Sequence, residues 1–288
     1  MNRIRIGSEG DGGYVMMNKD LDKVEVLYSY GVGNNSDFEH MFSENYGAIA
    51  RIYDHTVDKT SIEGELFDFK KEGIWHKKTE NHNTLENHIK QNNDGNKKMI
   101  LKIDVEGAEW DILRHIPDAV LGLFDQFSIE VHFLHSTGLH STGPYYRGNK
   151  LSELEITKKT DVIKKIKKSY YLYHVHANNN SPLYYINGFK IPNCMELTFI
   201  NKKQNELAKK SNVIFPTKFD RPCDPNRKDV DLHFWPFYPG IIRHISEIIS
   251  NLRWKSCLEI IRLIFKQIET RLKSFLIRVK LRRPTSHS

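Results

Sequence analysis

The sequence predicts an α/β protein built on a mostly parallel sheet with helices on both faces. Short apolar segments alternate along the chain with segments of helical spacing, which is the order that parallel sheets with crossover helices require. The apolar content of 39% can fill a core, and 27% charged residues is ordinary for a globular domain. No apolar stretch approaches the ~20 residues that span a bilayer, and the N-terminus lacks the apolar run of a secretory signal.

The first predicted elements form a strand, a helix and a second strand. The strand 24–35 runs into a glycine turn. The helix 36–47 follows it, with Ser36 as a suitable N-cap residue. The second strand, 48–58, carries Asp54 at its end.

A polar, irregular stretch separates this unit from the later elements. These are a short helix at 84–91, a strand at 97–107, a helix at 108–116, a strand at 125–135 and a helix that follows Lys150. Two late strands, PLYYING and PNCMELTFIN, are predicted to be joined by a turn at Asn187-Gly188. The proline-rich segment 215–240 is predicted to be irregular.

The net charge of +7 is concentrated at the C-terminus. Residues 241–288 hold 11 Lys/Arg and 3 Asp/Glu, a balance of +8, whereas residues 1–240 have a balance of −1. Apolar residues of the tail recur at helical spacing with basic residues opposite, which predicts a basic amphipathic helix or two in succession. We therefore expect a main domain at 1–240 and a tail at 241–288. The tail docks on the main domain, forms a homodimer or makes a peripheral membrane contact.

The cysteines and the distribution of charge predict where the protein is located and which partners it has. The three cysteines, Cys194, Cys223 and Cys257, make neither a disulfide framework nor a zinc motif, so we expect a reducing, cytoplasmic setting, peripheral to a membrane if the tail binds one. The main domain has no basic excess, which disfavours nucleic acid as a partner.

Three predicted strand ends meet where an open parallel sheet binds its ligands. Gly31 and Gly33 permit a tight turn and close backbone approach. Asp54 follows Gly31 by 23 residues, about the distance at which a carboxylate meets ribose hydroxyls in nucleotide-binding sheets. There is no GxxxxGK[ST] loop, and GxGxxG is incomplete because residues 34–36 are Asn, Asn and Ser. The pattern suits a nucleoside without a pyrophosphate, such as S-adenosylmethionine.

Asp104 lies at the third strand end, in the stretch LKIDVEGAEWDIL (101–113). A carboxylate where a strand leaves the sheet is costly unless it is solvated, paired or bound to a ligand. Glu106 and Glu109 fall in the first turn of the following helix, where the helix dipole favours negative charge. Their position in that turn is therefore enough to explain why these two residues are acidic. Asp104 is therefore the candidate site residue of this stretch.

LKIDVEGAEWDIL resembles the signature of FkbM-type S-adenosylmethionine-dependent methyltransferases. Other blocks resemble one methyltransferase-like branch of that family, in the expected order: GSEGDGGYVM (7–16), YSYGVGNNSDFE (28–39), RIYDHTVD (51–58), IEVHF (129–133), HVHANNN (174–180), PNCMELTFIN (192–201) and DRPCDPNRKDVD (220–231). The resemblance covers residues 7 to about 235. It implies a class I methyltransferase (Rossmann-like) fold and O-methylation of a sugar, a glycan or another hydroxylated metabolite.

The same resemblance implies a cofactor site for S-adenosylmethionine. Gly31 and Gly33 would pass beneath the methionine part of the cofactor, Asp54 would hold the ribose, and Asp104 would lie near the methyl donor. Ser29 stands where many class I enzymes have an acidic residue. The cofactor's amino group is therefore expected to rely on another carboxylate. Asp11 and Glu39 are the candidates for that role. The expected cofactor site also includes the rest of the DGGY turn, Gly12, Gly13 and Tyr14.

Glu130 and His132 are the predicted catalytic partners of Asp104. They lie in the next strand near the same edge, and strand alternation puts both on one face. Two mechanisms stay open. Asp104, Glu130 and His132 could bind Mg²⁺ or another divalent cation that lowers the pKa of the acceptor hydroxyl, or His132 could act as the base without a metal.

Other polar residues have a structural and a functional interpretation. His174, His176 and residues 178–180 could bond to a sugar, or the asparagines could form turns. Cys223 is interpreted as structural. His135 and His140 belong to a predicted loop that either covers the substrate or is simply solvated.

Two rival functions belong to different classes of protein. A catalytically inactive methyltransferase fold could serve as a binding or scaffold module attached through the basic tail, which the loss of an acidic residue at Ser29 favours. A nicotinamide-dependent oxidoreductase is disfavoured by the incomplete GxGxxG. Cofactor binding separates the three functions: a methyltransferase binds S-adenosylhomocysteine, an inactive module binds no cofactor, and an oxidoreductase binds NAD(P).

Overall fold

The computed structural model describes residues 2–134, 136–137, 149–186, 189–205, 213–233 and 237. Residues Met1–Leu232 form one compact unit. The predicted basic tail and the predicted loop around His140 lie outside the described residues, so the boundary at residue 240 stays a prediction. None of the described helices is both long enough and apolar enough to cross a membrane.

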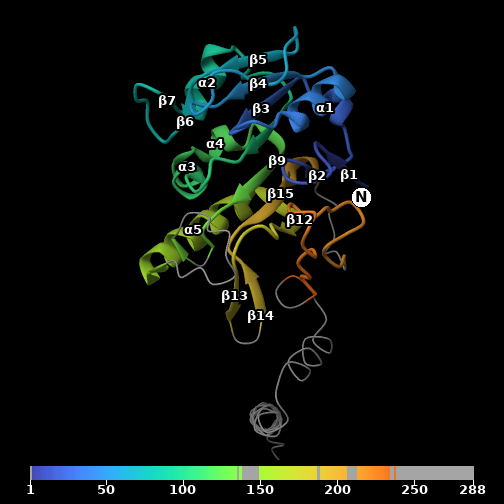
Figure 1. Cartoon of the computed structure of the whole chain (residues 1–288). Coiled ribbons are helices and arrows are strands. Elements are labelled where there is room, and N and C mark those ends of the chain that lie inside the picture. The colour runs from blue at the N-terminus through green and yellow to red at the C-terminus, as the bar shows by residue number, and fades with distance from the viewer. Residues whose placement is uncertain are drawn as a thin grey trace, which may run out of the picture. The chain divides into compact units, whose positions relative to one another are not determined.

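A seven-stranded sheet forms the centre of this unit (Figure 1). Its strands, in spatial order, are β12 (Tyr170–Ala177), β15 (Met195–Asn201), β9 (Phe124–Val131), β8 (Met99–Ile103), β3 (Val26–Tyr30), β4 (Ile49–Tyr53) and β5 (Phe67–Lys70). Neighbouring strands from β9 to β5 are parallel, and β15 alone in this sheet runs against the others. The predicted mostly parallel α/β architecture is confirmed.

Helices and short two-stranded pairs surround the sheet. The helices are α1 (Asp37–Tyr46), α2 (Leu85–Gln91), α3 (Glu109–His115), α4 (Asp118–Leu121) and α5 (Glu153–Ser169), with 3₁₀ turns at Leu21–Lys23 and Lys202–Gln204. The two-stranded pairs are β1 (Arg3–Ile6) with β2 (Tyr14–Met17), β6 (Gly73–Ile74) with β7 (His82–Asn83), β10 (Ser136–Thr137) with β11 (Asn149–Lys150), and β13 (Leu183–Ile186) with β14 (Phe189–Pro192).

Alternation along β3 and β4 gives the sheet two different faces. One face buries Leu27 and Ile52 in an apolar core with residues of α1 and of the β1–β2 pair. On the other face Tyr28, Tyr30 and Tyr53 stack with ring centroids 5.2 to 6.5 Å apart. Both faces of the centre are therefore covered, as a parallel sheet requires.

The structure differs from the sequence prediction in three places. The stretch interpreted as irregular contains β5, the edge strand of the sheet. The predicted turn at 187–188 lies outside the described residues; β13 pairs with β14, whereas MELTFIN forms the separate strand β15, inserted between β9 and β12. Ser36 occupies the N-cap position of α1, but its hydroxyl makes no capping hydrogen bond. Residues 213–233 contain no helix or strand, in agreement with the prediction for that segment.

Replacement of Gly31 by alanine is expected to damage the fold far more than the same change at Gly33. Gly31 has a φ of +78°, and an added Cβ would lie 1.7 Å from the carbonyl oxygen of Asp104. Gly33 has a φ of +50° and open space around it. We expect Gly33→Ala to lower the free energy of unfolding by about 1–2 kcal/mol, and Gly31→Ala by about 2–3 kcal/mol more because of the collision. Urea unfolding of both variants tests this, and equal losses would contradict it.

Candidate functional site

The strand order locates the ligand-binding edge of the sheet. From β3 the chain continues outward through β4 and β5, and it then returns to the other side of β3 as β8 and β9. The order therefore reverses between β3 and β8, and open parallel sheets bind ligands outside the carboxyl ends of the strands at such a point. The glycine turn, Asp54, Asp104 and His132 follow β3, β4, β8 and β9 in turn at this edge.

Asp54 holds the glycine turn in place. Its Oδ2 accepts hydrogen bonds from the backbone N–H of Val32 (3.0 Å) and of Gly33 (2.9 Å). Its Oδ1 accepts from the N–H and hydroxyl of Thr56, at 2.8 and 2.6 Å. Burial raises the pKa of Asp54, but these hydrogen bonds outweigh burial and hold it below its usual value. Four bonds occupy the acceptor capacity of a carboxylate. The expected ribose contact would thus share or replace one of them, and it stays a prediction.

A buried carboxylate of α1 lies next to Ser29. Glu39 is fully buried, and Ser29 donates a hydrogen bond of 2.5 Å to its Oε1. Lys102 Nζ lies 3.7 Å from the same oxygen and donates to the carbonyl of Gly31 at 2.6 Å. Among the described residues, Glu39 Oε2 has no hydrogen-bond partner. A helix residue thus brings to Ser29 the carboxylate that β3 itself lacks.

Tyr14 of the DGGY turn positions Asp104. The Tyr14 hydroxyl donates to Asp104 Oδ2 at 2.8 Å, and the N–H of Asp104 donates to the carbonyl of Tyr30 at 2.9 Å. Burial raises the pKa of Asp104 to about 6, although Lys102, His132 and Tyr14 lower it. A carboxyl group with this pKa can exchange a proton near neutral pH.

Glu109, at the start of α3, links the loop after β8 to β9. Its Oε1 accepts hydrogen bonds from the N–H of Val105 (3.2 Å), from the N–H of Gly107 (3.0 Å) and from His132 Nδ1 (2.9 Å). The side chain is fully buried. The helix dipole is therefore an incomplete explanation of Glu109, which orients the imidazole of His132.

His132 is held in its protonated form. Burial lowers the pKa of His132, but Glu109, Glu130 and Asp104 raise it to about 10. Its Nε2 lies 3.3 Å from Glu106 Oε2 and 3.6 Å from Glu130 Oε1. At neutral pH the imidazole therefore acts as a hydrogen-bond donor, and it can act as a base only after the charges around it change.

Glu130 is fixed by two donors. Its Oε1 accepts hydrogen bonds from Asn178 Nδ2 at 2.8 Å and from Cys194 Sγ at 2.7 Å. Burial, with the charge of Asp104 second, raises the pKa of Glu130 well above its usual value. Burial also raises the pKa of Cys194, so this cysteine is a thiol donor and not a nucleophile.

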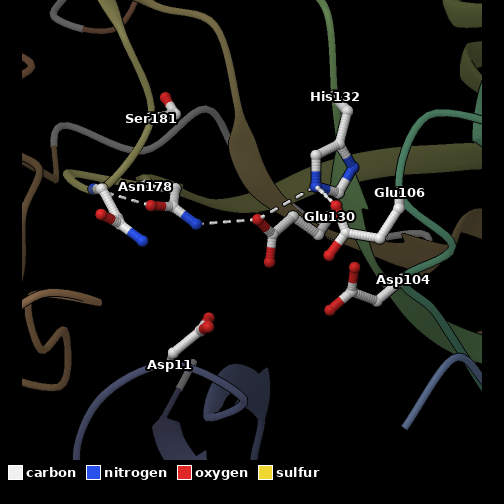
Figure 2. A pocket seen from close by; sticks show the side chains of 8 residues that line it. Asp11, Asp104, Glu106, Glu130, His132, Asn178 and Ser181 are labelled. Carbon is white, nitrogen blue, oxygen red and sulfur yellow. Dashed lines mark hydrogen bonds and ion pairs between the residues drawn. The ribbon is translucent and has the colours of Figure 1, made fainter. Parts of the chain in front are cut away.

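These side chains surround a cavity of about 210 Å³ (Figure 2). Its lining residues are Asp11, Asp104, Glu106, Glu130, His132, Asn178, Asn180 and Ser181. All eight are polar and four are carboxylates. Figure 2 shows Asp11 across the space from His132 and Glu130. A cavity of this composition suits a ligand rich in hydroxyl groups or a cation, because a buried polar group without a partner is costly.

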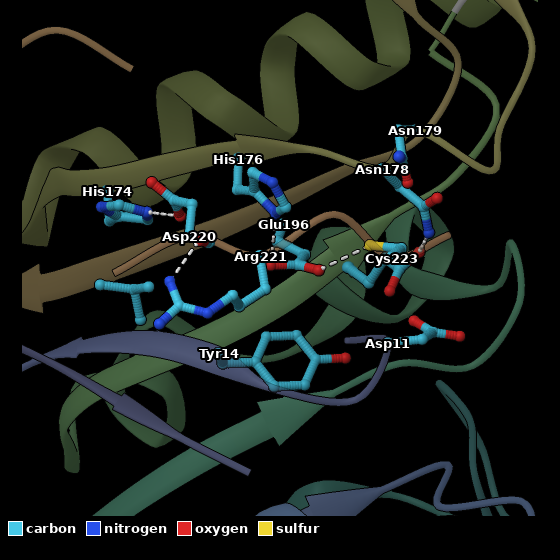
Figure 3. A network of polar contacts seen from close by, with 12 residues as sticks. Asp11, Tyr14, His174, His176, Asn178, Asn179, Glu196, Asp220, Arg221 and Cys223 are labelled. Carbon is cyan, nitrogen blue, oxygen red and sulfur yellow. Dashed lines mark hydrogen bonds and ion pairs between the residues drawn. The ribbon is translucent and has the colours of Figure 1, made fainter. Parts of the chain in front are cut away.

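A second polar network adjoins Glu130 through the sheet (Figure 3). The register of β12, β15 and β9 places His176 opposite Glu196, and Glu196 opposite Glu130. His176 Nδ1 lies 3.1 Å from Glu196, and its Nε2 lies 3.1 Å from Asp229. Burial lowers the pKa of His176, but the two carboxylates raise it to about 11. The thiol of Cys223 donates to Glu196 at 3.4 Å.

The polar cluster that the sequence places at 174–180 is divided between these two environments. Asn178 and Asn180 line the cavity. His174 and His176 are 2% and 1% exposed, and they pair with Asp220 and Asp229 of the segment 213–233. Sugar binding by these two histidines is therefore not supported. The structural interpretation of Cys223 agrees with its burial.

The structure brings together every residue expected to act in catalysis. Asp104, Glu130 and His132 line one cavity with Asp11, whereas the glycine turn and Glu39 lie outside the lining of the cavity. Sequence reasoning missed the roles of Glu109, Glu106 and Ser181. The available signal was the run DVEGAE, which has more acidic residues than a helix N-terminus requires.

Comparison with known proteins agrees with this geometry. The sequence model of the methyltransferase FkbM domain matches residues 10–163, which is more than half of the chain. The search of curated proteins found no match. The matched region contains the DGGY turn, the glycine turn, Asp104 and His132, and the seven-stranded sheet is consistent with a Rossmann-like methyltransferase. The chain belongs to the FkbM family of S-adenosylmethionine-dependent methyltransferases.

Proposed function

We propose that this protein transfers the methyl group of S-adenosylmethionine to a hydroxyl group of a sugar, a glycan or a similar hydroxylated metabolite. The observation that carries the choice of acceptor is the polar cavity beside Asp104. Carboxylates, amides and a hydroxyl around one space can hydrogen-bond several hydroxyl groups at once. An apolar acceptor would leave those groups without partners.

The cofactor belongs at the adjoining glycine turn in this proposal. Gly31 and Gly33 allow the close approach of a ligand to the backbone. The second oxygen of Glu39 is without a hydrogen-bond partner among the described residues, which supports an interaction with the amino group of the cofactor after a small side-chain movement.

In the proposed reaction the acceptor oxygen attacks the methyl carbon, the carbon–sulfur bond breaks and S-adenosylhomocysteine leaves. Alignment of the two reactants supplies much of the rate. The hydroxyl proton passes to a carboxylate of the cavity, for which Asp104 has a suitable pKa of about 6. His132, protonated and oriented by Glu109, stabilises the negative charge that develops on the acceptor oxygen.

Cofactor binding is tested by calorimetric titration with S-adenosylhomocysteine. We expect micromolar binding to the wild type. Asp54→Asn is expected to weaken it by about tenfold, equivalent to 1.4 kcal/mol, because an amide cannot accept all four hydrogen bonds that hold the glycine turn. Asp58→Asn is the matched control, since the side chain of Asp58 is 89% exposed and pairs with Lys71. Absence of binding to the folded wild type would instead favour an inactive binding module.

The role of His132 is tested with methyl-labelled S-adenosylmethionine and a panel of neutral saccharides. We expect His132→Gln to lower methyl transfer by about 100-fold, the usual effect of losing a positioned acid or base, without changing the affinity for S-adenosylhomocysteine. His40→Gln, at an exposed position on α1, should transfer methyl at the wild-type rate. If His132→Gln keeps the wild-type rate, His132 takes no part in the reaction.

A further inference from the structure

The lining of the cavity contains more carboxyl groups than cationic side chains. Asp11, Asp104, Glu106 and Glu130 contribute four carboxylates, and the one cationic side chain among the eight lining residues is His132. Like charges gathered in a buried space are costly unless a cation offsets them. The composition of the cavity therefore favours a positively charged occupant.

Two of these carboxylates each keep one oxygen without a hydrogen-bond partner among the described residues. The side chain of Glu130 is 5% exposed, and its Oε1 accepts the hydrogen bonds of Asn178 and Cys194. Its Oε2 accepts no hydrogen bond from the described residues, and Figure 2 shows this oxygen directed into the space. Asp104 uses Oδ2 to bind Tyr14, and its Oδ1 has no such bond within the described part of the chain. The donors on the first oxygens hold both side chains in position and leave the second oxygens for a ligand.

His132 is the residue common to two groups of candidate metal ligands, one that includes Glu130 and one that includes Asp104. The candidate ligand atoms of each group lie within 4.8 Å of one another, and the third members are Cys194 and Glu109 respectively. The Nδ1 of His132 is bonded to Glu109, and its Nε2 lies 3.3 Å from Glu106 Oε2 and 3.6 Å from Glu130 Oε1. Metal-binding histidines usually donate their other ring N–H to a carboxylate in this way.

The neighbouring histidine network does not share these properties. His176, Glu196 and Cys223 also place ligand atoms within 4.8 Å of one another. However, both oxygens of Glu196 are already bonded, Oε2 to His176 Nδ1 and Oε1 to the thiol of Cys223. None of the three lines the cavity. This network is therefore complete without a ligand.

We propose that Asp104, Glu130 and His132 bind one divalent metal cation in the cavity. The cation would replace the proton of His132 at Nε2 and would lower the pKa of an acceptor hydroxyl bound to it. With the cation bound, Asp104 and His132 would act as its ligands in place of their roles in the metal-free reaction, and the hydroxyl proton would pass to another carboxylate of the lining. The catalytic role of the cation rests on the proposed methyl transfer, whereas its binding does not.

Mn²⁺ is the probe, because carboxylate oxygens suit this ion and its free form is measured directly by electron paramagnetic resonance. The full chain is titrated with Mn²⁺ as wild type, Asp104→Asn, Glu130→Gln and Asp11→Asn. We expect one site in the wild type and a loss of affinity of at least about tenfold in the first two variants, the range found even for outer-shell groups. Asp11→Asn measures the effect of cavity charge alone, since Asp11 lines the same cavity on its opposite side and is not one of the proposed ligands, and its loss of affinity should be at least about threefold smaller than that of Asp104→Asn, a difference of about 0.7 kcal/mol.

Two results would overturn the cation site. One is no binding of millimolar Mn²⁺ to the folded wild type. The other is an equal loss in Asp11→Asn and Asp104→Asn, which would mean a diffuse negative field and no coordination. Thermal unfolding identifies any variant that does not fold. His132→Gln is then titrated with Mn²⁺ in place of that variant. Titration of the same samples with S-adenosylhomocysteine separates the proposed cation site from the proposed methyl transfer. If the protein binds the cofactor product but not Mn²⁺, the cation site is wrong and the proposed methyl transfer is unaffected.

Discussion

The carboxylate of Glu109 holds the candidate site together. The loop after β8 passes through left-handed backbone at Glu106 (φ 55°) and Gly107 (φ 112°), a path that would leave N–H groups unpaired. Buried N–H groups need partners, and Glu109 Oε1 accepts those of Val105 and Gly107. The same oxygen accepts the ring N–H of His132. One buried side chain thereby fixes the position of Asp104 relative to β9.

The two walls of the cavity come from different parts of the chain. The matched family domain, 10–163, supplies Asp104, Glu130 and His132 together with the glycine turn. The opposing amides and the hydroxyl, from Asn178, Asn180 and Ser181, lie beyond it. Their loop follows β12, which ion pairs attach to the segment 213–233. The matched family domain and the segment beyond it thus supply different sides of the cavity.

The sequence predicted those parts of the site that depend on local pattern. Glycine and aspartate at the ends of apolar runs marked the ligand edge, and period-two alternation placed Glu130 and His132 on one face. It failed where pairing between distant segments decides the structure. The strand β5 lies in a polar stretch and is defined by its pairing with β4 at one edge of the sheet. His176 is buried with Glu196 and Asp229 as partners, and both lie far from it along the chain. Glu109 was missed because its hydrogen-bond donors include a residue of another strand.

The charge of the cavity also bears on which acceptors it can take. A phosphate or carboxylate brought within 4 Å of one of its carboxylates would be repelled by about 4 kcal/mol at an effective dielectric constant of 20, so a neutral polyol is favoured over an anionic sugar. The proposed methyl transfer leaves the net charge of the cavity unchanged. The positive charge leaves the sulfur of the donor and reappears as a proton on a carboxylate of the lining. The net charge of the cavity and its contents is therefore the same before and after the step, and departure of that proton restores the negative field that attracts the next sulfonium donor.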